Sequence, residues 1–231
     1  MFSKIVTSAL FAGFAAGLIA GLLQLNFMQP VLLHAELYET GQLVHFGGDG
    51  NVSAAQETGG FNLNRDGLSI LFVALAYTGF AFMLVAAMAA ASDRGVTINA
   101  RTGLIWGLAG FIAFQLAPGA GLPPEVPGAA AADMGARQLW WFSTIAATAL
   151  ALAMIAFGRN PLVLVAAVVL LLAPHVIGAP HPDAFAGTAP PELAGLFAAR
   201  SLAVALAGWT LLGMFAGYFW SRDEADVKAA V

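Results

Sequence analysis

Four histidines carry the most distinctive chemistry in this sequence, and three of them stand near carboxylates. His34 is followed by Glu36, and His175 is followed by His181 and Asp183. Imidazole nitrogens together with carboxylate oxygens suit the later first-row divalent metals, so these five side chains are candidate metal ligands. A single histidine at a helix end more often caps that end or reaches toward water. A metal site therefore requires that these side chains converge.

The elements that must position these residues are membrane helices. Hydrophobic residues make up 60% of the chain and charged residues only 10%, and the mean hydropathy is +0.82. Soluble domains are about 45–50% apolar and about 25% charged. The composition therefore predicts an all-α integral membrane protein whose building unit is an apolar span of about 20 residues.

Six apolar runs are expected to cross the membrane, or five if the shortest does not. The third run has only 15 residues before Pro118 and is the weakest of them. The predicted spans are Ile5–Met28, Leu68–Ala91, Gly103–Ala117, Leu139–Phe157, Leu162–Ala173 (extended to Ile177) and Ser201–Trp220. We expect one polytopic membrane domain over residues 1–221 and a short charged cytoplasmic tail over residues 222–231.

The distribution of Lys and Arg predicts which side each loop faces. With six spans and a cytoplasmic N-terminus, six basic residues are inside and three outside, as the positive-inside rule requires. The outer three are Arg65, Arg137 and Arg200. The same topology places on the outer side all four histidines and nine carboxylates: Glu36, Glu39, Asp49, Glu57, Asp66, Glu125, Asp133, Asp183 and Glu192. The outer face is therefore predicted to collect cations.

Proline and arginine recur at the ends of the predicted spans. Pro30, Pro118 and Pro174 are each expected to end an outward-going helix, with residues 31–66 forming the first outer loop. The three outer arginines precede the inward-going helices and are expected to pair with loop carboxylates. Three similarly oriented helical hairpins around a central path are one arrangement that this pattern allows.

A few side chains within the apolar runs could line an ion path. Gln24 and Met28 share a helix face at i, i+4 spacing, and Gln115 lies three residues before Pro118. Polar groups in a membrane are costly and often functional. Hydrogen bonding between helices is the alternative for each amide. The spacing of Ala9, Gly13, Gly17 and Gly21 instead indicates a face for close helix packing.

Several functions are disfavoured by what the sequence contains. A formal charge of −4 and only nine Lys plus Arg residues argue against a nucleic-acid partner. The sequence has no cysteine, so it has neither disulfide nor thiolate ligand. It also has no nucleotide-binding or hydrolase motif. We expect a non-enzymatic protein without a tightly bound cofactor, surrounded by lipid.

Several short motifs, in this order and spacing, resemble the CbtA family of predicted cobalt transporter subunits over nearly the whole chain. The first is the opening Met1-Phe2 with Lys4, followed by the glycine-spaced first helix, Gln24, Pro30 and His34-Ala35-Glu36. Next comes the block Gly107–Phe111, which continues through Gln115–Pro118 to Gly121–Glu125. The segments Arg137–Trp141 and Pro174–Pro180 complete the set.

The resemblance implies cobalt uptake across a bacterial cytoplasmic membrane, often linked to cobalamin supply. It also implies a small single-span companion, CbtB, that carries a histidine-containing metal-binding end. Members are often described with five spans. A second function remains open from the residues alone, because His34 and His175 at helix ends could hold a haem in an intramembrane redox protein. A Soret absorption band would distinguish the two.

Overall fold

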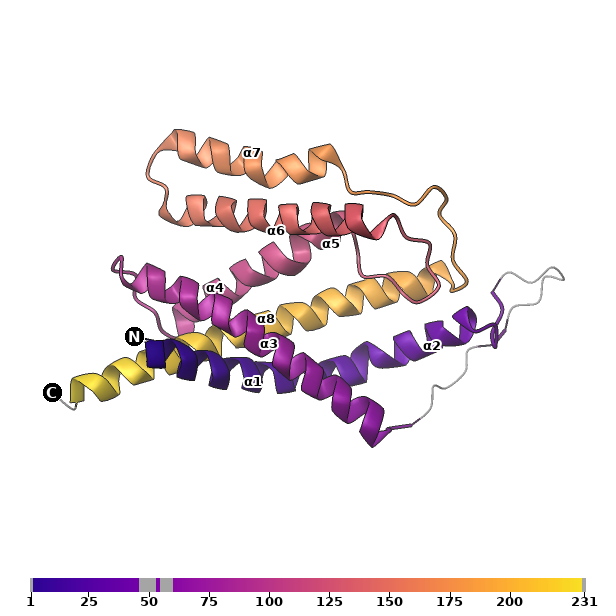
Figure 1. Ribbon diagram of the computed structural model, residues 1–231, viewed down its shortest axis with the longest axis horizontal. Coiled ribbons are helices and arrows are strands. Elements are labelled where there is room, and N and C mark those ends of the chain that lie inside the picture. The colour runs from indigo at the N-terminus through magenta and orange to yellow at the C-terminus, as the bar shows by residue number, and fades with distance from the viewer. Residues whose placement is uncertain (1, 46–52, 55–59, 230–231) are drawn as a thin grey trace. The chain divides into compact units, whose positions relative to one another are not determined.

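A computed structural model describes residues 2–45, 53–54 and 60–229, and within them the protein consists of helices joined by loops (Figure 1). The elements in order are α1 (Phe2–Phe27), α2 (Gln29–Glu39), α3 (Leu63–Ser92), α4 (Ala100–Phe111), the π-helix η1 (Ile112–Leu116), α5 (Ala117–Gly121), α6 (Met134–Phe157), α7 (Pro161–Ile177) and α8 (Pro191–Ala229). Asp49 and Glu57, two of the outer carboxylates, lie outside the described residues.

Five helical stretches are long and apolar enough to cross a membrane, which makes this an all-α multi-pass membrane protein. They are Phe2–Phe27, Leu63–Ser92, Ala100–Gly121, Met134–Phe157 and Pro191–Arg222. A sixth apolar helix, Pro161–Ile177, has 17 residues. At 1.5 Å per residue it is about 26 Å long, at the lower limit for a hydrocarbon core of about 30 Å. The third span, predicted to be the weakest, is thus longer than the fifth.

The helices group into two compact units. The first contains residues 1–26, 60–111 and 203–231, and the second contains residues 27–59 and 112–202. Helix α8 contributes its first part to the second unit and its remainder to the first.

Close backbone approach at glycine builds the first unit. A Cβ added at Gly13 or Gly17 of α1 would lie 2.5 Å from the Cα of Thr78 or Ala74 of α3. Gly103 and Gly107 of α4 likewise face Gly213 of α8, with no space for a side chain. Such contacts let helices pack by dispersion forces where lipid removes the usual hydrophobic drive. The predicted packing face on the first helix is confirmed.

Side chains rather than bare backbone separate the helices of the second unit. Helices α6 and α7 form an antiparallel hairpin (Figure 1), in which the buried Trp140 Nε1 donates a hydrogen bond of 3.0 Å to the carbonyl oxygen of Pro174. Near the start of α8, the buried Val31 and Ala35 of α2 pack in a core with Val126 and Phe197. This unit therefore places proline-rich loops next to helix ends.

The prediction that a helix ends at proline holds at Pro30, where α1 ends at Phe27 and a new helix follows, and is wrong at Pro118 and Pro174. Pro30 lies in the first turn of α2, where its missing N–H costs nothing. Pro118 lies in the first turn of α5, directly after η1, whose wider turn accommodates the proline ring. Pro174 lies inside α7, which continues to Ile177 before Gly178 at φ 88°. Helices therefore extend into segments that we expected to be loops.

Candidate functional site

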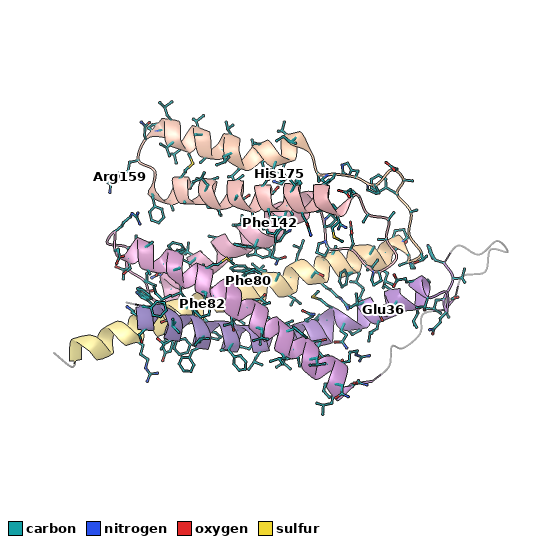
Figure 2. All side chains as sticks on the ribbon, viewed as in Figure 1. Glu36, Phe80, Phe82, Phe142, Arg159 and His175 are labelled. Carbon is teal, nitrogen blue, oxygen red and sulfur yellow. The ribbon has the colours of Figure 1, made fainter. Side chains whose placement is uncertain are left out.

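The predicted metal ligands lie on helices and loops of the second unit. His34 and Glu36 belong to α2 and not to a loop, which corrects the prediction for residues 31–39. His175 is in the last turn of α7, and His181 and Asp183 follow in the loop to α8. Figure 2 shows Glu36 and His175 well apart on their two helices.

His34 is the most enclosed of these candidates. Its ring lies 5.5 Å from the Tyr38 ring one turn further along α2. Its Nε2 atom is buried and has no hydrogen-bond partner within the described part of the chain. An imidazole nitrogen in this state retains the capacity to bind a proton donor or a metal ion.

The histidines near α7 are exposed. The His175 ring packs edge-on against Trp140 at 6.0 Å between centroids, and the His181 ring lies 6.1 Å from the Phe185 ring. Asp183 is also exposed. Over residues 2–45, 53–54 and 60–229, no three His, Asp or Glu side chains form a group that could hold a metal ion. The five-ligand site remains a prediction that the structure does not assemble.

Three outer segments of the second unit do come together at one end. A single antiparallel bridge joins Ala129, in the loop before α6, to Gly187, in the loop after α7. A Cβ added at Gly128 would overlap the Thr188 hydroxyl, 2.5 Å away, and would lie 3.4 Å from Glu39 at the end of α2. The end of α2 and the segments that follow α5 and α7 therefore share one end of this unit.

An open cavity of about 470 Å³ lies in the second unit, between η1 with α5, the loop over residues 122–125 and the first turns of α6. Its polar lining consists of Gln115, Glu125, Arg137 and Gln138. Arg137 donates from Nη2 to Glu125 Oε2 at 2.7 Å, with both side chains about one third exposed (30% and 32%). The expected pairing of this arginine with a loop carboxylate is confirmed.

In the described part of the chain, the other two arginines predicted to face outward contact groups other than loop carboxylates, since Arg65 contacts a carboxylate of its own helix and Arg200 contacts a backbone carbonyl. Arg65 Nε lies 2.7 Å from Oδ1 of the buried Asp66. Arg200 donates from Nη1 to the carbonyl oxygen of Phe27 at 3.0 Å, and Phe27 ends α1, where carbonyl groups lack helical partners. These arginines therefore organise helix ends.

The model of a family described as probable cobalt transporter subunits, CbtA, matches residues 2–221. This protein belongs to the CbtA family. No curated protein and no solved structure matches it. A CbtA protein is a transporter subunit, which agrees with the expected non-enzymatic role and with a multi-pass membrane protein.

The cavity of this CbtA protein contains one predicted path residue and several that the sequence analysis did not select. Gln115, predicted as a path residue, lies on η1 at the cavity wall. Met134, Gln138 and Trp141 were missed, although they recur every three or four residues around Arg137 and so share one face of α6. Gln24 and Met28 are half-buried at the end of α1 and in the turn after it.

Proposed function

We propose that this CbtA protein is the membrane subunit of an uptake transporter that carries divalent cobalt into the bacterial cytoplasm. The observation that carries this proposal is the family match, which extends over residues 2–221. Cobalt is the transported substrate here, and no resident cofactor is needed. The small single-span CbtB-like companion that the resemblance implies would be the other component of the transporter.

The proposed orientation places the N-terminus of α1 and the membrane end of α8 in the cytoplasm. The Lys4 ammonium lies 3.8 Å from the Trp220 ring centroid. Gly217 is packed against the backbone of Asn99, in the link between α3 and α4. One end of the first unit thus combines basic residues of three segments, Lys4, Arg101 and Arg222 among them. This supports an inner position for that end by the positive-inside rule.

In this topology the segments that follow the outward-going helices would meet the external medium and collect the metal. The converging segments of the second unit present His34 and Glu36 from α2, and His175, His181 and Asp183 from the end of α7. We propose that these side chains concentrate the ion through successive weak contacts. Imidazole and carboxylate suit cobalt, and several partial sites release an ion more readily than one complete chelate does.

Removing the two helix histidines tests this role. We expect the His34→Ala, His175→Ala double variant to accumulate cobalt on the order of tenfold more slowly than wild type at limiting external cobalt. The deficit should shrink at saturating cobalt, because a weakened outer binding step limits uptake most below saturation. Radioactive cobalt accumulation in cells that lack other cobalt uptake systems would measure it.

His45→Ala provides a matched control, because it removes a third histidine of the same predicted face. Equal membrane abundance of all variants must be shown first. Wild-type uptake by the double variant at limiting cobalt would remove His34 and His175 from the mechanism. An absorption spectrum of the purified chain belongs with this assay, since a Soret band lost in the double variant would support the haem-binding alternative.

A further inference from the structure

The cavity beside α6 is lined by charged and amide side chains that are not part of the proposed histidine entry site. It brings a carboxylate, a guanidinium and two amide side chains to one opening: Glu125, Arg137, Gln115 and Gln138. The residues come from three separate elements, namely η1, the proline loop and α6. All of them belong to the second unit.

We infer that this cavity is a station for the hydrated divalent cation, and that Arg137 is the counter-cation that occupies Glu125 when the station is empty. This inference rests on the proposed cobalt uptake and adds the chemical form in which the ion is bound. It assigns a binding role to Glu125 and a gating role to Arg137.

The geometry of the ion pair supports exchange of one cation for another. Arg137 Nη2 contacts Glu125 Oε2 at 2.7 Å, and each side chain keeps about one third of its surface accessible. A cation can therefore reach the carboxylate from the cavity while the arginine turns away. A dication interacts with a carboxylate about twice as strongly as a single charge does at equal distance. When the ion leaves, the guanidinium restores neutrality, so the carboxylate is never left unpaired.

The size of the cavity and its donors favour an ion that retains its water. Six waters at about 30 Å³ each occupy about 180 Å³, well within the cavity of about 470 Å³. Water bound to a dication donates hydrogen bonds outward and therefore needs acceptors. The carboxylate oxygens of Glu125 and the amide oxygens of Gln115 and Gln138 are acceptors at the cavity wall.

Opposite charge changes at the two ends of this ion pair test the inference. Both Glu125→Gln and Arg137→Gln break the same contact, so a purely structural role predicts similar effects from the two. We expect Glu125→Gln to weaken cobalt binding to the purified full chain by about tenfold or more. We expect Arg137→Gln to strengthen it several-fold, because the competing cation is gone. Calorimetric titration with cobalt chloride would measure both.

Two controls keep this test interpretable. Arg137→Lys retains the competing charge and should bind cobalt like wild type. If Arg137→Gln does not fold, cobalt binding by Arg137→Lys still tests whether a positive charge at this position sets the affinity. Asp133→Asn removes a neighbouring loop charge while keeping an N-cap side chain for α6, and should leave affinity unchanged. Affinities that shift in the same direction in Glu125→Gln and Arg137→Gln would overturn the inference.

The hydrated form of the ion is tested with cobalt(III) hexaammine, a complex of similar size that does not exchange its ligands. We expect it to inhibit cobalt(II) uptake by the wild-type protein and to inhibit the residual uptake of Glu125→Gln much less. Absence of inhibition in the wild-type protein would show that the ion must lose its shell. If wild-type cells take up cobalt and Glu125→Gln does so equally well, this inference fails while the proposed function stands.

Discussion

The two units of this protein use small residues in different ways. In the first unit, glycines of α4 and α8 face each other so closely that a Cβ at Gly213 would overlap the Gly103 carbonyl oxygen. In the second unit, a Cβ at Gly119 would meet only a methyl group of Leu202 at an ordinary 3.4 Å. Gly119 lines the open cavity. The comparison indicates that backbone contacts at glycine make the first unit a frame, whereas side chains and an open cavity lie between the helices of the second unit.

The ion pairs of the two units also differ in how exposed they are. The second unit contains the ion pair between Glu125 and Arg137 at the rim of a cavity, with about one third of each side chain exposed. The first unit has its own ion pair, but there Asp66 is only 1% exposed and also accepts from the Asn62 backbone N–H at 2.7 Å. A buried carboxylate fixed by several donors holds a helix end in place. A half-exposed one can change partners.

The largest effect on stability is expected from adding a side chain where glycines of α4 and α8 are in contact in the first unit. Gly213→Ala places a methyl group against the backbone of α4, 2.6 Å from the Gly107 Cα, where no side chain can move aside. We expect a loss of about 3 kcal/mol or more in stability, as for severe overpacking. Thermal unfolding monitored by size-exclusion chromatography in detergent would show it.

The control for this change is Gly79→Ala in α3, where an added Cβ has nothing within 4 Å. This variant should be as stable as wild type, or more stable by about 0.5–1 kcal/mol because alanine favours a helix. Equal unfolding temperatures for Gly213→Ala and Gly79→Ala would show that the backbone contact at Gly213 does not stabilise the first unit.

A smaller effect is expected from loosening the α6–α7 hairpin in the second unit. Trp140→Phe removes the indole N–H that donates to the Pro174 carbonyl oxygen. That oxygen still accepts from the backbone N–H of Gly178 at 3.0 Å, so we expect a loss of only about 1 kcal/mol. Thermal unfolding should show a modest decrease, with Trp141→Phe at the cavity wall as control. A decrease as large as that of Gly213→Ala would show that both units are equally dependent on close packing.

Hydropathy and residue spacing predicted which segments form helices better than they predicted where each helix ends. Long apolar runs and the glycine face on the first helix were sufficient to predict the membrane class and the packing of α1 on α3. The ends at Pro118 and Pro174 were wrong because proline was treated as a helix terminator. In this chain proline starts α2, follows a π-helical turn, or lies one turn before the end of α7.

The candidate site could be predicted only in part. Arg137 pairs with a loop carboxylate, as predicted, and the structure identifies this carboxylate as Glu125. The cavity that both line includes Gln115 of η1, and the five-residue π-helix has no simple sequence signature. A histidine metal site would require these side chains to converge in space. Sequence spacing cannot predict such convergence, because the histidines belong to different elements of the fold.

The most direct test of the account is cobalt uptake by cells in which ATP and membrane potential are controlled separately. A potential of 100 mV acts on a divalent cation with roughly 4.6 kcal/mol, which is enough to drive inward movement without nucleotide hydrolysis. Because the sequence contains no nucleotide-binding motif, we propose that the membrane potential drives uptake. Wild-type uptake should then continue after ATP depletion while the potential is maintained, and stop when an ionophore collapses the potential. Uptake that follows ATP at constant potential would contradict it.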